Sequence, residues 1–414
     1  MSFSRRGLAA NVRPMSHISN PPYPRITLKK GAHKRLLSGH PWIYSNEVNM
    51  DLAAKALPLG SFVTISEASG KPLATAYFNS KTLIAARVLS LAPDVAIDTA
   101  FISARFNSAL KLRTRLFDEP FYRLVHAEAD GLPGLVVDRF DNAYVLQPNT
   151  AGMEALIDVI VSSLKQTLLP HTIVIRGDSV SRKLEGLEDS VRCVLGESSA
   201  PVAVRENGVT FFADLMTGQK TGWFFDQRDN HAFIASLSGG ASVLDLYTHT
   251  GGFALACASA GATSVTAVDR SATALKLARK AAVANQLTDR CTFKQNEVFP
   301  FLDEAVSNKQ NWDVVIADPP PFIKSKKDLK AGLQGYRKLS RLCALTTAPG
   351  GFLFVASCSH NAPLEEFTAA VVRRVADAGR SGRVIRTSGA GPDHPIHALL
   401  PESAYLKALV LQLD

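Results

Sequence analysis

The chain has 414 residues, of which 46% are hydrophobic and 20% are charged, and this composition indicates a globular protein of two to four domains. The formal net charge at pH 7 is +9, which favours a polyanionic partner. No two of the five cysteines have CxxC spacing, so neither a metal site nor a disulfide framework is expected, and a reducing compartment such as the cytoplasm fits best. Residues 246–268 and 342–364 lack charged side chains, but glycine pairs, serines and threonines interrupt them. Buried strands with loops are expected there, and no membrane helix.

The positive charge is concentrated at the N-terminus. Residues 1–46 contain eight Lys or Arg and no Asp or Glu, and the rest of the chain is nearly neutral. This distribution is typical of a nucleic-acid-binding patch. Residues 1–24 lack the apolar segment of a secretory signal. We expect them to be a disordered basic extension, with an organellar transit peptide as the alternative.

Two small domains are predicted next. Short strands separated by turn residues recur at 26–28, 61–65, 73–77 and 84–88, and this spacing is typical of a small β-barrel, which we assign to residues 25–96. Helical patterns at 100–116 and 153–168 are combined with short strands at 122–127, 134–140, 143–146, 172–176 and 191–195. Residues 97–200 are therefore expected to form a compact α+β middle domain.

An alternation of strands and helices begins at about residue 201. Apolar runs at 243–245, 265–268, 292–294, 314–317 and 352–356 are separated by helical segments such as 271–285. This alternation predicts an α/β domain with a doubly wound parallel sheet over residues 201–414. Such sheets bind ligands in the crevice outside the carboxyl ends of their strands, so the residues after each run are the candidates for a site.

The segment 245–253, between the first of these strands and a helix, has the features of a nucleotide-type site. Gly251–Gly252 lets the backbone approach a ligand closely, and Asp269, at the end of the next strand, can accept hydrogen bonds from a ribose diol. The segment has no Gly-x-Gly, which argues against a pyrophosphate cofactor. The spacing suits S-adenosylmethionine, whose amino group and sulfonium also suit Asp245. Asn296–Glu297 follows the third strand, where it would meet the adenine.

Two further strand ends carry the residues with reactive chemistry. Asp318 follows the run 314–317 and Cys358 comes just after the run 352–356, so both are expected at one edge of the sheet. A thiolate that adds to C6 of cytosine makes C5 nucleophilic enough to take a methyl group, which is covalent nucleophilic catalysis. A carboxylate can bind the exocyclic amine and, when protonated, N3. The remaining cysteines are expected to be small core residues: Cys193, Cys257, Cys291 and Cys343.

The residues after Asp318 indicate how a flat base would be held. The rigid backbone of Pro319 and Pro320 would line a slot together with Phe322. The cationic run that begins at Lys324 could hold substrate phosphates, although a solvated loop explains it equally well. A base within a helix would have to be flipped out, or be single-stranded, to reach this slot.

Ten segments are together characteristic of one family: His40–Ser45, Glu128–Phe140, Arg182–Leu187, Lys220–Asp229, Thr250–Phe253, Asp318–Pro320, Ser357–Ser359, Asp393–Pro395, Pro401–Glu402 and Tyr405–Lys407. Through them the chain resembles the bacterial 23S ribosomal RNA large-subunit methyltransferases of the cytosine-C5 type, over about residues 25–414. The resemblance implies a PUA-like RNA-binding domain at 25–96 and a class I S-adenosylmethionine-dependent methyltransferase domain at 201–414. It also implies the formation of 5-methylcytosine, with Cys358 as nucleophile and Asp318 as the carboxylate that orients the substrate.

The motifs and the resemblance together give the expected contacts of the cofactor: Asp245, Tyr247, Thr250, Gly251, Gly252, Asp269, Asn296, Glu297, Asp226, Gln227 and Arg228. Two positions depart from the family pattern. Members usually have Lys where this chain has Pro321, and an aromatic or amide side chain where it has His249. The first departure affects the grip on RNA beside the slot, and the second affects the cofactor loop.

Three other functions stay open on the sequence alone. The first is methylation of a guanine in the same RNA, with Cys358 structural. The second is a small-molecule methyltransferase with extra domains, and the third is a catalytically silent RNA-binding or assembly factor. The sequence is also compatible with a homodimer, and it does not give the modified nucleotide.

Overall fold

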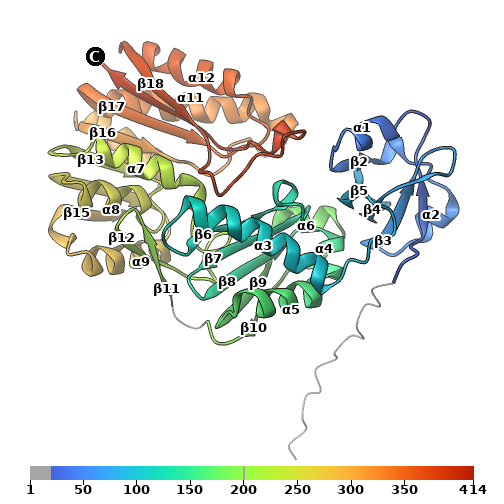
Figure 1. Ribbon diagram of the computed structural model, residues 1–414. Coiled ribbons are helices and arrows are strands. Elements are labelled where there is room, and N and C mark those ends of the chain that lie inside the picture. The colour runs from blue at the N-terminus through green and yellow to red at the C-terminus, as the bar shows by residue number, and fades with distance from the viewer. Residues whose placement is uncertain (1–19, 199–200, 324) are drawn as a thin grey trace, which may run out of the picture.

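The computed structural model describes residues 20–198, 201–323 and 325–414. Almost all of the predicted extension, and Lys324, therefore lie outside the described residues. Three units follow one another along the chain: an N-terminal sheet, a middle α+β unit, and a large C-terminal α/β unit (Figure 1). Tyr23, which we expected within the extension, is buried, and its hydroxyl donates a 3.2 Å hydrogen bond to the carbonyl of Val95.

The N-terminal unit is built on a five-stranded sheet of order β1-β3-β4-β5-β2. Its elements are β1 (Arg25–Thr27), α1 (His33–Leu37), β2 (Trp42–Tyr44), α2 (Leu52–Ala56), β3 (Ser61–Ser66), β4 (Pro72–Phe78) and β5 (Ile84–Ser90). A single antiparallel bridge joins Leu28, just after β1, to Val48, just after β2. The bridge brings the two edge strands of the sheet together, as in a small barrel.

The middle unit combines a second five-stranded sheet, of order β10-β9-β8-β7-β6, with two helices that pack on each other. Its elements are α3 (Thr99–Leu116), β6 (Phe121–His126), β7 (Leu135–Phe140), β8 (Ala143–Pro148), α4 (Ala151–Ala155), α5 (Ile157–Leu168), β9 (Thr172–Gly177), α6 (Val180–Leu184) and β10 (Ser190–Leu195). Asp98 caps α3 by accepting the N–H of Phe101 at 2.9 Å. The strands and the two longer helices agree with the predicted pattern.

The C-terminal unit is a seven-stranded sheet of order β15-β14-β13-β16-β17-β19-β18, preceded by the β11–β12 hairpin. The sheet strands are β13 (Ser242–Leu246), β14 (Ser264–Asp269), β15 (Cys291–Gln295), β16 (Trp312–Ala317), β17 (Thr347–Ser357), β18 (Gly382–Ser388) and β19 (Lys407–Leu413), and the hairpin is β11 (Val202–Glu206) and β12 (Val209–Ala213). The first five strands of the sheet are parallel, as predicted. At one edge β19 pairs antiparallel with both β17 and β18, and the sequence analysis predicted neither β18 nor β19.

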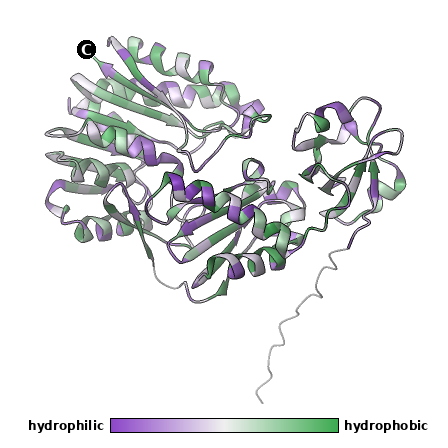
Figure 2. Ribbon diagram, viewed as in Figure 1, coloured by the Kyte–Doolittle hydropathy of each residue, from purple (hydrophilic) through white to green (hydrophobic). Residues whose placement is uncertain are grey.

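Helices cover both faces of this sheet, which makes it doubly wound. They are α7 (Arg228–Ser236), α8 (Gly252–Ser259), α9 (Ala272–Ala284), α10 (Val298–Ser307), α11 (Leu329–Thr346) and α12 (Leu364–Asp377). Alternate strand residues face opposite cores: Val243 packs with α8 and α9, whereas Leu244 packs with α10, α11 and α12. The strands are mostly hydrophobic and the helices have mixed polarity (Figure 2). No helix in the described part of the chain is long and apolar enough to cross a membrane.

Hydrogen bonds to Asp393, from residues that also lie in or beside buried ion pairs, join the middle unit to the C-terminal unit. The guanidinium of Arg113 pairs with Asp130 at 2.6 Å and also donates to the carbonyl of Asp393 at 2.9 Å. The carboxylate of Asp393 accepts the backbone N–H of Arg123, whose own guanidinium pairs with Asp138. Each charge has a partner of opposite sign or a hydrogen bond, as buried charges require. These contacts fix the middle unit against the segment between β18 and β19.

Candidate active site

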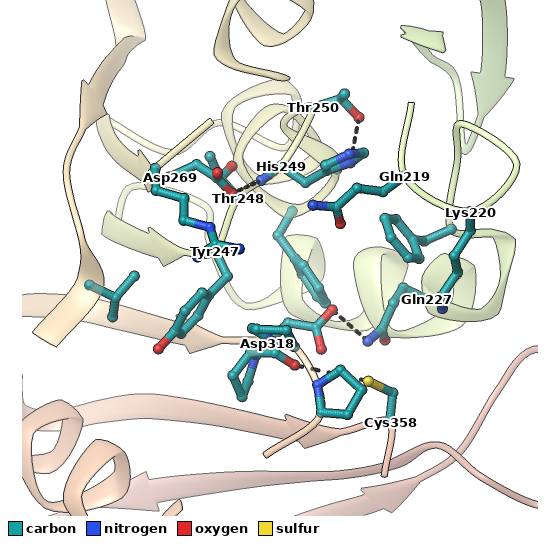
Figure 3. Close-up of a pocket in the computed structure, with 18 of the residues that line it drawn as sticks. Gln219, Lys220, Gln227, Tyr247, Thr248, His249, Thr250, Asp269, Asp318 and Cys358 are labelled. Carbon is teal, nitrogen blue, oxygen red and sulfur yellow. Dashed lines mark hydrogen bonds between the residues drawn. The ribbon is translucent and has the colours of Figure 1, made fainter. Parts of the chain in front are cut away.

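A cavity of about 360 Å³ opens at the carboxyl ends of the parallel strands, between them and the segment that precedes the sheet. Most of the predicted site residues line it: Asp226, Gln227, Tyr247, Thr250, Gly252, Asp269, Asn296, Glu297, Asp318, Pro319, Pro320, Phe322 and Cys358. Asp269, His249 and Thr250 gather at one end, whereas Asp318, Gln227 and Cys358 gather at the other (Figure 3). The cavity therefore has two ends of different chemistry.

The loop between β13 and α8 forms one wall of the cavity with an unusual backbone. Tyr247, His249 and Gly251 have φ values of 63°, 50° and 88°, in the left-handed region that only glycine adopts without strain. Such strain costs on the order of 1–3 kcal/mol per residue and persists only where surrounding contacts impose it. Here the N–H of His249 donates to Asp269 at 2.9 Å, and Thr248 donates its N–H to the carbonyl of Val268.

Asp245 braces this loop from behind and does not line the cavity. Its Oδ2 accepts hydrogen bonds from the hydroxyl of Thr248 and from the N–H of Ala254. Its Oδ1 is buried without a hydrogen-bond partner among the described residues. Burial raises the pKa of Asp245 to about 7, and both hydrogen bonds oppose the shift. Asp245 was expected to contact the cofactor directly, but its side chain does not reach the surface of the cavity. Its Oδ1 atom remains without a hydrogen-bond partner.

Asp269 ends β14 with its carboxylate at the cavity surface. Its two oxygens accept the N–H groups of His249 and Ser271, at 2.9 and 2.8 Å. A carboxylate oxygen has further lone pairs, so Asp269 can also accept from a diol. Burial lowers the pKa of His249 to about 4, so its ring is neutral at pH 7. The carboxylate of Asp269 would repel a phosphate, so this end of the cavity suits a nucleoside better.

Cys358 projects into the cavity from the loop after β17. Its Sγ lies 4.0 Å from the carbonyl oxygen of Pro319. The neighbouring serines are buried and hold the loop: Ser357 shares a 2.7 Å hydrogen bond with the hydroxyl of Tyr336, and Ser359 accepts the N–H of Ile323 at 3.3 Å. The Ser-Cys-Ser motif thus anchors two side chains in the protein and directs the thiol between them toward the cavity.

The electrostatics of the thiol depend on its neighbours. Burial raises the pKa of Cys358 to about 11, the positive charge of Lys220 opposes that shift, and the charges of Asp318 and Asp226 add to it. The ammonium of Lys220 lies 3.9 Å from Asp226 and 4.5 Å from the centre of the Phe224 ring. Lys220 is thus a cation that favours a thiolate at this end of the cavity.

Asp318 follows β16 and faces the same end of the cavity as the thiol. Its Oδ2 accepts a 2.8 Å hydrogen bond from the amide of Gln227. Burial raises the pKa of Asp318 to about 6, the charge of Asp226 adds to the rise, and the hydrogen bond from Gln227 opposes it. A carboxyl group with this pKa can exist in either protonation state near neutral pH, so it can both accept and donate a proton.

Asp226 is the anionic counterpart of Lys220. Burial opposes its ionisation, yet the charges of Lys220 and His394 and a hydrogen bond from Tyr405 together lower its pKa to about 2.

Arg228 was predicted to contact the cofactor, but the structure places its guanidinium outside the cavity. The side chain donates to the carbonyl of Phe121 and stacks on Phe117, at 4.6 Å from the ring centre.

Three further predictions have mixed outcomes. Gly251 is the N-cap of α8 and does not line the cavity; its φ of 88° shapes the loop instead. Lys324 lies outside the described residues. Of the four remaining cysteines, Cys257 and Cys343 are fully buried as expected, whereas Cys193 and Cys291 are only partly buried at the edge of the core.

Comparison with known proteins identifies the family. A family model described as an S-adenosylmethionine-dependent methyltransferase matches residues 177–398, and a PUA-like domain model matches residues 26–91. Ribosomal RNA large subunit methyltransferase I of Pseudoalteromonas atlantica is 33% identical over 94% of this chain and 99% of its own length. The Klebsiella pneumoniae protein of the same name is 34% identical over 94% of this chain. The chain belongs to the ribosomal RNA large subunit methyltransferase I family.

Solved structures share the fold of this methyltransferase. A putative SAM-dependent methyltransferase from Streptococcus mutans aligns with a TM-score of 0.79 and 20% identity, over 94% of this chain and all of the other. A putative methyltransferase complexed with SAH (S-adenosylhomocysteine) aligns equally well. The α/β fold, the PUA-like domain and the dependence on S-adenosylmethionine that the sequence predicted are thereby confirmed.

The cavity of the methyltransferase fits S-adenosylmethionine. Asp269 can accept from its ribose hydroxyls, and the polar wall at Asn296–Glu297 lies next to Val298 and Phe299, whose apolar side chains suit a flat adenine. The buried, unpartnered Oδ1 of Asp245 lacks a cationic or N–H partner, which an ammonium group would supply. When bound, the cofactor supplies an electrophilic methyl group.

The sequence analysis did not name as site residues several that line this cavity: Gln219, Lys220, Trp223, Phe224, His231, Thr248, Arg270, Val298, Phe299 and Leu406. The first five belong to the segment before the sheet, where no strand pattern marks a site. Their position beside Asp226–Gln227 in the chain is the one signal that could have indicated them.

Proposed function

We propose that this enzyme methylates C5 of a cytosine in 23S ribosomal RNA, by way of a covalent bond between Cys358 and C6 of the base. The observation that carries the proposal is the shared position of Cys358 and Asp318 at one end of the methyltransferase cavity. Support for the RNA comes from relatives that are named ribosomal RNA large subunit methyltransferase I. Such RNA lies in the bacterial cytoplasm, which is the proposed location.

Cys358 solves the main chemical difficulty of the reaction. C5 of cytosine is too weak a nucleophile to displace a methyl group from a sulfonium. When the thiolate forms a bond to C6, electron density moves to C5 and to N3, and C5 becomes enamine-like. The positive charge of Lys220 lowers the pKa of the Cys358 thiol and so favours the thiolate that this addition requires.

Asp318 takes the complementary role at N3. Its raised pKa, about 6, gives a fraction of protonated carboxyl near neutral pH, and the proton can pass to N3 as the thiolate adds to C6. The carbonyl of Pro319 lies beside the thiol and can accept from the exocyclic amine of the same ring. The carbonyl of Pro319, as an acceptor, favours cytosine over uracil, which has an oxygen at C4.

The remaining steps restore the aromatic base. C5 bonds to the methyl carbon as the methyl–sulfonium bond breaks, and S-adenosylhomocysteine is left. A base then takes the C5 proton, the C6–sulfur bond breaks as the proton on N3 returns to Asp318, and the thiolate of Cys358 is regenerated. No oxidant or reductant is consumed, so the thiol returns to its starting state.

One observation favours a second candidate, methylation of a guanine with Cys358 structural. Burial raises the pKa of Cys358 to about 11, so the thiol without substrate is neutral at pH 7. A neutral thiol packed against Pro319 is also what a purely structural residue would present.

Mapping of the methylated atom, together with a cysteine variant, separates the two functions. Ribosomal RNA transcribed in vitro is methylated with labelled S-adenosylmethionine, digested to nucleosides and analysed by mass spectrometry. The proposal requires 5-methylcytidine from the wild type and at least about a 10³-fold slower reaction for Cys358→Ala. A methylguanosine product, or full activity of Cys358→Ala, would replace the proposal with the second candidate. Cys193→Ala serves as the matched control, because Cys193 lies in the middle unit, away from the cavity.

A further inference from the structure

Three aromatic rings pack on one another beside the thiol end of the cavity, and the mechanism above does not use them. The imidazole of His360 packs on the phenol ring of Tyr405, with 5.2 Å between the ring centroids and 30° between the planes. Tyr405 packs in turn on the imidazole of His126, at 6.3 Å and 27°. Each ring is thus nearly parallel to its neighbour, in the offset-stacked arrangement that aromatic side chains favour.

This stack adjoins the cavity on the side of Cys358. His360 follows Cys358 by two residues, so their α-carbons are at most about 7 Å apart. Leu406, the neighbour of Tyr405, lines the cavity, and the hydroxyl of Tyr405 donates to the carboxylate of Asp226, which is another lining residue. A flat ligand held against His360 would therefore lie directly beside a base that occupies the cavity.

The loop that carries His360 is held in one position. The carbonyl oxygen of Ser359 accepts the backbone N–H of Ala362 at 3.1 Å and the ammonium of Lys407 at 2.8 Å. The side chain of Ser359 is also fixed, because its hydroxyl accepts the N–H of Ile323. An aromatic surface that is already in place loses little conformational entropy when a ligand binds to it.

His360 is the exposed member of the stack, whereas Tyr405 and His126 are half-buried. One face of its ring lies against Tyr405, and within the described part of the chain no other aromatic ring packs on it. The other face is therefore open to a planar ligand from the solvent side. Unpaired bases of RNA bind to exposed aromatic side chains in this way.

The charge state of the ring favours a base over a phosphate. Burial and the charges of Lys407 and Lys220 lower the pKa of His360, so the imidazole is neutral at pH 7. A neutral ring offers its π-face to a base and has no charge with which to bind a phosphate.

We propose that His360, supported by Tyr405, stacks the base of the nucleotide next to the one that is methylated. This inference rests on the RNA substrate of the proposed function and extends it to the neighbouring nucleotide, which must be unpaired. Every base has a π-face, so the stack selects an unpaired neighbour and not a particular sequence. His360 is a binding residue for the RNA, and it takes no part in the transfer of the methyl group. The assignment holds whichever base the enzyme methylates.

Methylation of synthetic RNA that lacks one base tests this assignment. Two versions of a large-subunit RNA fragment carry an abasic residue, one on each side of the methylated nucleotide. For the wild type we expect kcat/KM to fall about 10- to 100-fold on one of the two, which is the stacking of one base. His360→Ala should show the same loss on the intact RNA and no further loss on that abasic RNA. His360→Phe should keep most of the activity, because it retains an aromatic face.

Two controls separate stacking from an effect on the fold. Calorimetric binding of S-adenosylhomocysteine should be the same for His360→Ala and the wild type, since the cofactor does not touch the stack. His171→Ala removes an exposed histidine of the middle unit, away from the cavity, and should match the wild type on all three RNAs.

Three results would overturn the stacking role while the ribosomal RNA function stands. They are wild-type activity of His360→Ala on intact RNA, losses from His360→Ala and from the abasic residue that simply add, and a His360→Phe variant as slow as His360→Ala. Absence of methylation of the intact RNA by the wild type would instead overturn the proposed function, and the stacking role with it.

Discussion

The amide of Gln227 donates a 2.8 Å hydrogen bond from Nε2 to Oδ2 of Asp318, and so joins the segment before the sheet to the end of β16. The orientation of this amide is fixed by a chain of bonds. Oε1 of Gln227 accepts from the amide of Asn230 at 2.7 Å, and the carbonyl oxygen of Asn230 accepts from the hydroxyl of Ser388 at 2.6 Å. Gln227 can therefore only donate to Asp318, which leaves the other carboxyl oxygen for a substrate.

Replacement of Gln227 should shift the titration of Asp318. The hydrogen bond lowers the pKa of this carboxyl, so in Gln227→Leu the pKa should rise above its value of about 6. More of the carboxyl is then protonated at pH 7, while its position is less well defined. We expect kcat/KM to fall about 10- to 100-fold and the limb of the pH–rate profile that belongs to Asp318 to move to higher pH. A profile whose limbs stay at the wild-type pH would show that Asp318 is not titrating in the reaction.

Removal of Lys220 should make the thiol harder to ionise. Burial holds the pKa of Cys358 at about 11 and the charge of Lys220 opposes that rise, so Lys220→Gln should raise the pKa further. The rate of alkylation of Cys358 by iodoacetamide should then reach its half-maximum at higher pH, and Lys220→Arg should restore the wild-type curve. Lys276→Gln, at an exposed position on α9, is the control. Identical curves for wild type and Lys220→Gln would remove Lys220 from the activation of the thiol.

Asp245 should destabilise the free enzyme at high pH. Its folded-state pKa is raised to about 7 from an ordinary value of 3.8, so the folded protein holds this proton more tightly than the unfolded chain. Below about pH 4 both states are protonated and there is no effect. As the pH rises through 7 the folded carboxyl ionises, and stability is lost.

Asp245→Asn keeps an oxygen for Thr248 and Ala254 but cannot ionise. Without cofactor, thermal unfolding should show the variant to be more stable than wild type at pH 8, on the order of 1–3 kcal/mol, with no difference near pH 4. The variant should bind S-adenosylhomocysteine at least about 10-fold more weakly. A variant less stable than wild type at pH 8 would contradict the raised pKa, and unchanged affinity would exclude Asp245 from the cofactor site.

The positions of Asp318 and Cys358 could be predicted from the sequence because each follows a continuous apolar run. Such runs are buried parallel strands, and all parallel strands of one sheet end at the same edge. The strand β18 was not predicted because its sequence is mostly polar and exposed and is not a continuous apolar run. The strand β19 was not predicted because it is inserted antiparallel at the edge, without the helix that marks a βαβ unit. The order of strands at that edge depends on contacts between distant parts of the chain.

The sequence analysis misplaced Arg228 and gave no role to His231 and Glu206 for the same physical reason. Gln227 and Arg228 are adjacent at the start of α7, and successive helical residues point about 100° apart. Gln227 therefore faces the cavity while Arg228 points to Phe117 and Phe121. Likewise His231, which lines the cavity, and Glu206, its buried hydrogen-bond partner, are 25 residues apart, and only the packed hairpin and helix bring them together. Residue type and spacing along the chain do not determine such directions.

The most direct measurement of the central claim is covalent trapping on RNA that contains 5-fluorocytidine. Fluorine at C5 cannot leave as a proton, so after methyl transfer the bond between Cys358 and C6 cannot break. Large-subunit RNA transcribed with 5-fluorocytidine is incubated with the enzyme and S-adenosylmethionine, and the products are separated on a denaturing gel. A covalent mechanism predicts a protein–RNA adduct that requires S-adenosylmethionine, persists with Cys193→Ala and disappears with Cys358→Ala. Absence of an adduct, when the enzyme methylates the same RNA made with ordinary cytidine, would contradict the cysteine mechanism.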